Sequence, residues 1–181
     1  VGPLADAFFA SAHEPATGQL LAVDQQQRLG TLSPVDATFT PTFAIQGAQG
    51  SVQGLATLGA PEPLYLSTYD VPNSRLYRID RATGLATLIG EMSGRAIIDI
   101  AIDGSGELYG HDIVTDSIYR IHATTAATQL VGPTGIPANY AQGMDFDRRS
   151  GQLYAWIYDE LQGNTAFSRI DLDTGQAQVL V

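Results

Sequence analysis

The side chains best suited to chemistry in this chain are its carboxylates and three histidines, and His111, Asp112 and Asp116 form the densest group. Carboxylate oxygens suit Ca²⁺, which takes about six to eight oxygen ligands. Asp99, on a neighbouring expected strand, could add another oxygen. An Asp-x-Asp-x-Asp-Gly calcium loop is absent. The sequence therefore leaves two states open, a chain without a cofactor and a chain that binds calcium through these four residues.

A second set of aspartates recurs at the ends of equivalent expected strands. Its members are Asp24, Asp70, Asp112 and Asp159. Placed at one face of a repeated fold, they could form an acidic ring. An aspartate that ends a strand also commonly accepts hydrogen bonds from the backbone of its own turn, and this structural role is the competing interpretation.

Other catalytic arrangements find little support. Asp145 and Asp147 are two residues apart on one expected strand, about 7 Å, a spacing that a glycosidase pair could use. Asp147, however, begins a tight turn of the repeat. A Gly-x-Ser-x-Gly motif is absent, and His13, His111 and His122 fall in different repeat positions. We therefore expect no catalytic residues, with a divalent-metal-dependent hydrolase or lyase as the alternative.

The aromatic residues divide into two classes. Those that recur at one repeat position are expected to pack between repeats: Tyr65, Tyr109 and Tyr154. Those that break the repeat are the candidates for stacking against a ligand: Trp156, Tyr158, Tyr69 and Tyr140. Trp156 with Tyr158 is the preferred pair, and carbohydrate is the ligand that such a platform suits.

The charge balance narrows the choice of partners. The 181 residues include 19 acidic and 9 basic side chains, for a net charge of -10, and all the basic ones are arginine. Such a chain repels phosphate backbones, so nucleic acid is not an expected partner. No apolar run approaches the roughly 20 residues of a membrane span. Hydrophobic residues make up 44% of the chain, enough to form a packed core.

The composition also bears on compartment. The chain has no cysteine, which removes disulfides and thiolate catalysis. An acidic chain without cysteine or lysine, rich in Thr, Gly, Asp and Gln, is common among exported bacterial proteins, so we expect a secreted or extracellular bacterial protein. The chain starts without Met, as a processed chain or a piece of a longer protein would.

A repeat of about 44 residues must position all these side chains. Leucines at positions 20, 64, 108 and 153 lie in matching segments, spaced by 44, 44 and 45 residues. Each is followed by a segment with period-two alternation, a turn and a β-branched run, which together predict four antiparallel strands per unit. No helical periodicity is present, and the 19 glycines and 9 prolines interrupt the chain often.

Units of this size with four strands are typical of β-propeller blades. The segments 74–90 and 106–112 resemble repeats of bacterial secreted β-propeller proteins and, more distantly, the YWTD and NHL repeats. We therefore expect an all-β fold, a single propeller domain over 1–181 with four blades of four strands. The expected blades span about 6–45, 51–92, 95–132 and 139–181.

Whether the blades close a ring stays open at this level. Four blades could form a closed ring or part of a larger propeller. Propellers commonly bind ligands on the face that carries the loops between blades and between second and third strands. We therefore expect a non-catalytic extracellular module, within a larger secreted protein or alone, that presents a binding or assembly surface. Its partner would be a protein or a carbohydrate on the loop face, and it would self-associate if the ring is incomplete.

Overall fold

Alternating apolar and polar residues produce strands throughout the chain. The computed structural model describes residues 7–15 and 17–181, and at 140–142 it describes the backbone alone. This part of the chain contains strands and turns but no helix, and hence no helix that could span a membrane. The strands form four antiparallel sheets of four, and within each sheet they lie in chain order.

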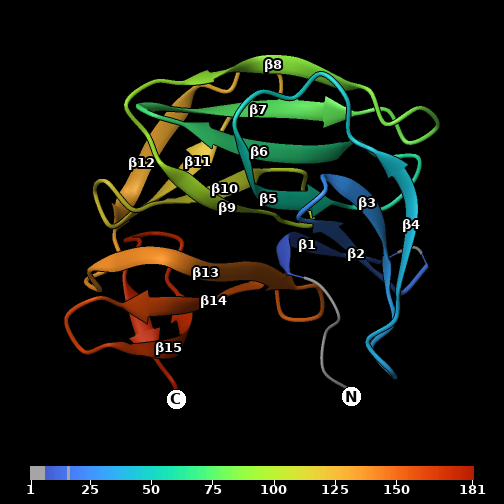
Figure 1. Ribbon diagram of the computed structural model, residues 1–181. Helices are drawn as coiled ribbons and strands as arrows, with labels where there is room; N and C mark the ends of the chain where they lie inside the picture. Colours follow the sequence, from blue (N-terminus) through green and yellow to red (C-terminus); the bar gives the residue numbers. More distant parts are fainter. Residues whose placement is uncertain (1–6, 16) are drawn as a thin grey trace.

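Each sheet is one blade (Figure 1). Blade 1 contains β1 (Phe8–Glu14), β2 (Gln19–Asp24), β3 (Arg28–Leu32) and β4 (Phe39–Ala44). Blade 2 contains β5 (Ser51–Thr57), β6 (Leu64–Asp70), β7 (Asn73–Ile79) and β8 (Ala86–Met92). Blade 3 contains β9 (Ile97–Ile102), β10 (Leu108–Asp112), β11 (Ser117–Ile121) and β12 (Thr128–Pro133). Blade 4 contains β13 (Ala138–Asp147), β14 (Gln152–Asp159), β15 (Asn164–Ile170) and β16 (Ala177–Val179).

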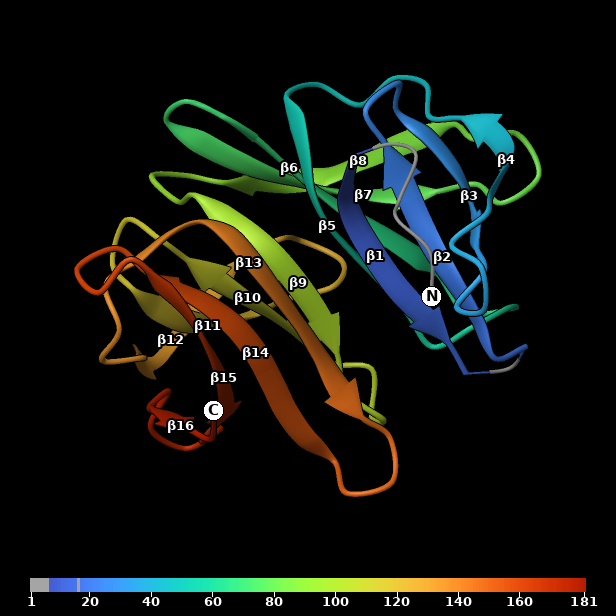
Figure 2. The ribbon, with the colours of Figure 1, turned by 60° about the horizontal axis from the view of Figure 1, so that its bottom comes forward.

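The first strand of each blade is innermost, and the blades follow one another around a common axis (Figure 2). β1 packs on β5, β5 on β9 and β9 on β13. This arrangement confirms the four-bladed β-propeller expected from the repeat.

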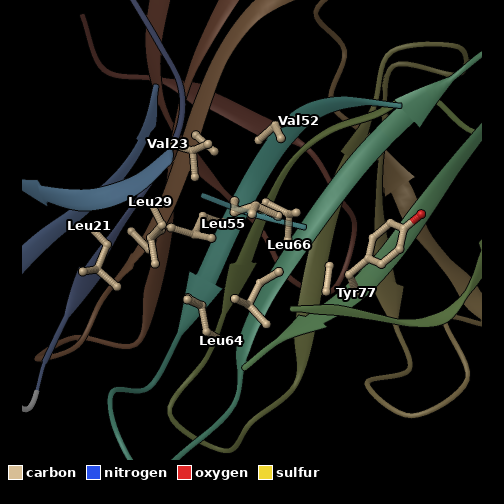
Figure 3. Close-up of a cluster of buried hydrophobic side chains, with 13 residues drawn as sticks. Leu21, Val23, Leu29, Val52, Leu55, Leu64, Leu66 and Tyr77 are labelled. Atoms are coloured by element: carbon tan, nitrogen blue, oxygen red, sulfur yellow. The ribbon is translucent and has the colours of Figure 1, made fainter. Parts of the chain in front are cut away.

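Three apolar clusters fill three of the seams between blades. The cluster between blades 1 and 2 joins side chains such as Leu21 and Leu29 to Leu64 and Leu66 (Figure 3). A second cluster joins blades 2 and 3, and a third joins blades 3 and 4. No such cluster joins blade 4 to blade 1 among the described residues. Burial of these faces supplies the main stabilisation of the fold.

The turns between third and fourth strands repeat one design. Asp80 accepts backbone hydrogen bonds from Ala82 and Thr83, at 2.8 and 3.0 Å. Asp171 does the same in blade 4. Those hydrogen bonds lower the pKa of both aspartates. Each turn ends on a residue with positive φ, for instance Gly84 at 76°.

Candidate functional site

A large recess on the expected ligand face lies between blades 1 and 2. This loop-face groove has a volume of about 800 Å³. It is formed by the β2–β3 and β6–β7 loops and by the first residues of β1, β5 and β9. Its lining comprises Phe8, Phe9, Asp24, Gln25, Gln27, Ser51, Val52, Gln53, Tyr69, Asp70, Val71 and Ile98.

The walls of the loop-face groove expose apolar surface. Phe9 is 55% exposed and Val71 is 76% exposed. Phe8 is held by an edge-to-face contact with Phe39, their ring centroids 5.0 Å apart. Tyr69 is half-buried, and the buried side chain of Ile98 lies at the start of the third blade's inner strand. Exposed apolar side chains gathered around one recess are typical of a binding site.

The two carboxylates at the loop-face groove are both paired. The Asp24 carboxylate lies 2.6 Å from the Arg28 guanidinium, and its side chain is fully buried. Burial alone would raise the pKa of Asp24, but hydrogen bonds from Arg28 and its positive charge outweigh burial, so the pKa is lowered. The Asp70 carboxylate, 63% exposed, lies 3.6 Å from Arg75. Of the described residues that line the groove, none is basic.

The expected acidic ring does not face solvent. Asp24, Asp112 and Asp159 are buried, and only Asp70 is exposed. Asp159 accepts hydrogen bonds from the backbone of Leu161 and Gln162, at 2.9 and 3.0 Å. The three buried strand-end aspartates therefore fix their own loops, which is the structural role that competed with the acidic ring.

The proposed calcium ligands each have a different structural role. Asp112 accepts hydrogen bonds from the Ala96 and Val114 backbones, from the Thr115 hydroxyl, and from Arg95 at 3.3 Å. Asp116 accepts a 2.8 Å bond from the Ala138 backbone and so ties blade 3 to blade 4.

The other two residues of that set lie on neighbouring strands, Asp99 on the innermost strand β9 and His111 on β10. His111 lies directly across from Asp99 in the β9–β10 register, and both are buried. Within the described residues, no three acidic or histidine side chains are arranged so that they could hold a metal ion. Calcium binding by Asp112, Asp116, His111 and Asp99 stays a prediction.

Two carboxyls, the buried Asp99 and the half-buried Asp145, lie near the axis. Asp99 accepts hydrogen bonds from the Ile100 backbone at 2.8 Å and from the Met144 backbone at 2.6 Å. Burial raises its pKa well above the ordinary 3.8, although these hydrogen bonds oppose the shift. Burial also raises the pKa of Asp145, against the opposing hydrogen bond from Phe146 and the charge of Arg148. These carboxyls link inner strands.

The aromatic residues proposed for ligand stacking lie in two places. Tyr69 lies in the loop-face groove. Trp156, 50% exposed, packs against Phe167 with ring centroids 4.8 Å apart, on the face of blade 4 that points away from blade 3. Tyr158 lies two residues further along β14 and is half-buried. The side chain of Tyr140 lies outside the described residues. Ligand binding by these four residues stays a prediction.

Part of the loop-face groove was foreseen, because the loops between second and third strands, including the one that holds Val71, were expected on the ligand face. Phe8 and Phe9 were not foreseen, because residues at the start of a strand carry no periodic signal. The one available clue was the pair of adjacent phenylalanines, which no other repeat contains. The groove also depends on which blades become neighbours in space, and this order is not visible in the sequence of a single strand.

Comparison with known proteins adds information on the fold alone. No protein-family model and no curated protein sequence matches the chain. A protein of unknown function from Bacteroides thetaiotaomicron aligns with a TM-score of 0.66 and 16% identity, over 96% of this chain and 43% of that one. A chain of the nidogen–laminin complex aligns with a TM-score of 0.67 and 18% identity, over 90% and 61%.

An enzyme shares the same fold. Virginiamycin B lyase from Staphylococcus aureus aligns with a TM-score of 0.56 and 15% identity, over 97% of this chain and 55% of the enzyme. The chain thus spans between 43% and 61% of the length of these solved propellers. At such identities the likeness shows a β-propeller and nothing about activity.

Proposed function

We propose that the chain is a non-catalytic binding module that acts outside the cell as part of a larger protein, and that it holds a polypeptide segment in the loop-face groove. The observation that carries the proposal is the exposed apolar lining of that groove, above all Phe9 and Val71. Burying such surface against a partner is favourable at roughly 25 cal/mol per Å².

The mixture of side chains favours a polypeptide over a carbohydrate. Sugars stack on flat aromatic faces, whereas the exposed Val71 offers aliphatic surface suited to an apolar side chain. Glutamine amides at positions 25, 27 and 53 can pair with a peptide backbone through both donor and acceptor atoms. The groove thus combines apolar contacts with hydrogen bonding, as peptide-binding sites do.

The charge of the groove restricts the segment further. Asp70 is largely exposed, no described lining residue is basic, and the whole chain carries a net charge of -10. A segment with net negative charge would be repelled. We therefore expect a segment that is neutral or basic and contains apolar side chains.

The wider fold is compatible with this role but does not decide it. One propeller of similar structure belongs to the nidogen–laminin complex, and another is a lyase. The metal-dependent hydrolase or lyase has the weaker support, because the Asp112 oxygens are already engaged by four donors.

Selection from a random peptide library tests the proposal. Peptides are selected on the unaltered chain, and their dissociation constants are then measured for Tyr69→Ala, for Val71→Ser and for the control Val114→Ser. Val114 is 62% exposed in the β10–β11 loop, the loop of blade 3 that corresponds to the β6–β7 loop holding Val71, but it lies outside the groove. We expect Tyr69→Ala and Val71→Ser to weaken binding by about tenfold or more, or about 1.4 kcal/mol.

Three outcomes would contradict the proposal. One is the recovery of no peptide. Another is equal binding by Val71→Ser and Val114→Ser. The third is binding of neutral oligosaccharides, presented as an array, through the same residues, which would identify a carbohydrate module instead.

A further inference from the structure

The strand-end aspartates of blades 1, 3 and 4 bind the backbone of their own loops. Each carboxylate accepts a hydrogen bond from the N–H two residues further along, in a turn that aspartate commonly forms. Such a bond engages the carboxylate within the loop, and all three side chains are buried. The three pairs are Asp24 with Gln26 at 3.0 Å, Asp112 with Val114 at 3.2 Å, and Asp159 with Leu161 at 2.9 Å.

Blade 2 departs from this arrangement because a proline occupies the donor position. The residue two positions after Asp70 is Pro72, which has no backbone N–H to donate. The Asp70 side chain is 63% exposed, and its carboxylate lies 3.6 Å from the Arg75 guanidinium. A hydrogen bond between two such charged groups is usually about 2.7–2.9 Å long. Asp70 therefore keeps acceptor capacity that neither its loop nor Arg75 uses.

Arg75 does not neutralise this rim of the loop-face groove, because a second carboxylate shares it. Glu91 lies 3.4 Å from the same guanidinium. The Asn73 amide donates a 2.9 Å hydrogen bond to Glu91, and its oxygen accepts one from the Gly94 backbone at 2.8 Å. Two carboxylates thus flank one guanidinium, so the rim keeps a net negative charge. A cation carried by a ligand would be attracted to it.

A repeated β-bulge brings further side chains into the same groove. At the loop-face end of each inner strand of blades 1 to 3, the pairing with the second strand shifts by one residue. The extra residue is Phe9 in β1, Gln53 in β5 and Ile98 in β9, and all three line the groove. Bulges often re-aim side chains next to functional sites. Phe9, 55% exposed, therefore presents an aromatic ring in the recess that also contains Asp70.

We propose that Asp70 determines the specificity of the loop-face groove by binding a basic side chain, so that the bound segment carries an arginine or lysine within a few residues of an apolar side chain. This inference rests on the proposed function, because it assigns the ligand class of that groove. The Asp70 carboxylate accepts charge-assisted hydrogen bonds from the guanidinium or ammonium group. Phe9 and Val71 cover the apolar side chain. A calcium ion suits this position poorly, since one available carboxylate is far short of the about six to eight oxygens that calcium takes.

Charge reversal tests the proposal. A peptide selected on the unaltered chain and a version with its basic residue replaced by glutamate are both titrated into the unaltered chain and into Asp70→Lys. We expect the unaltered chain to prefer the basic peptide by about tenfold, and Asp70→Lys to prefer the glutamate version, because an attractive charge pair is exchanged for a repulsive one. The milder Asp70→Asn should weaken the basic peptide by about fivefold.

The matched control is Glu160→Lys. Glu160 is exposed in the β14–β15 loop, the loop of blade 4 that corresponds to the β6–β7 loop, and it lies outside the groove. This variant makes the same change in net charge and should keep the preference for the basic peptide. A preference reversed equally by Glu160→Lys and Asp70→Lys would overturn the proposal, since it would come from the overall charge of the chain.

The remaining outcomes separate this proposal from the proposed function. Selected peptides without basic residues, or an unchanged preference in Asp70→Lys, would overturn the role of Asp70. The groove would still be the binding site if Val71→Ser weakened those peptides more than Val114→Ser. Recovery of no peptide, or equal binding by these two valine variants, would overturn both proposals.

Discussion

The three packed seams and the fourth seam, between blades 4 and 1, use the same repeat positions, yet they differ in burial. Leu153 is fully buried between blades 3 and 4, whereas its counterpart Leu20 is half-buried beside the fourth seam. Tyr109 and Tyr154 differ in the same way. A repeat position therefore determines which face of a blade a side chain lies on. Whether that face is covered depends on the neighbouring blade.

The largest expected effect compares two leucines at one repeat position. Leu153→Ala removes a fully buried side chain and leaves a cavity, so we expect a loss of about 2–5 kcal/mol in the free energy of unfolding. Leu20→Ala removes a side chain that is already partly hydrated, so we expect about 1 kcal/mol. Urea unfolding measures both values. Equal losses for the two variants would contradict this comparison, because they would mean that the fourth seam, between blades 4 and 1, is packed like the others.

The second-largest expected effect concerns the ion pair between Arg81 and Glu14, which lies at the packed seam between blades 1 and 2. Arg81 bonds the Glu14 carboxylate at 2.7 Å and the Thr57 hydroxyl at 2.6 Å, and Glu14 is only 5% exposed. Arg81→Ala leaves the Glu14 carboxylate with one side-chain partner, Thr17. We expect a loss of about 1–3 kcal/mol, measured by urea unfolding. The control Arg149→Ala alters an exposed arginine and should cost less than about 0.5 kcal/mol. A cost for Arg81→Ala no greater than that of the control would mean that the bridge does not stabilise the seam.

A smaller effect distinguishes two aspartates on β13 by pH. The folded-state pKa of Asp145, at the seam between blades 4 and 1, is raised by burial, so its contribution to stability is full below about pH 3.8 and is lost as pH rises through that raised pKa. The pKa of Asp147 is lowered by hydrogen bonds from Ser150 and Arg149, so its contribution is present above 3.8 and is lost as pH falls through the lowered value.

Substitution by asparagine should therefore give opposite trends. Relative to the unaltered chain, Asp145→Asn should gain stability as pH rises from 4 to 8. Asp147→Asn should lose stability between pH 3 and 5 as pH rises. Thermal melts across this range measure both trends. Parallel curves for the two variants would mean that Asp145 is as well solvated as Asp147.

The fold could be predicted from the sequence because the repeat is read along the chain. Four leucines spaced by 44 or 45 residues and the turn aspartates Asp80 and Asp171 are local signals, and each produces a local structure. The loop-face groove is not local, since Phe9, Val71 and Ile98 come from three blades and meet only after the blades pack. The buried state of Asp112 was likewise not visible, because its partner Arg95 belongs to the loop that precedes β9.

The smallest expected effect is the response to calcium, and it tests the packed seam between blades 2 and 3. Arg95, which bonds Asp112, also lies 4.1 Å from the centre of the Tyr119 ring, so a cation at Asp112 would have to displace a well-packed guanidinium. A ligand at about 100 times its dissociation constant would add about 2.7 kcal/mol, or about 5–10 °C in melting temperature for a domain of this size. We expect calcium or EDTA to change the melting temperature by less than about 1 °C, well below that value. A rise with calcium that disappears in Asp112→Asn would instead show that Asp112 binds the ion, and would restore the metal-dependent hydrolase or lyase as the better hypothesis.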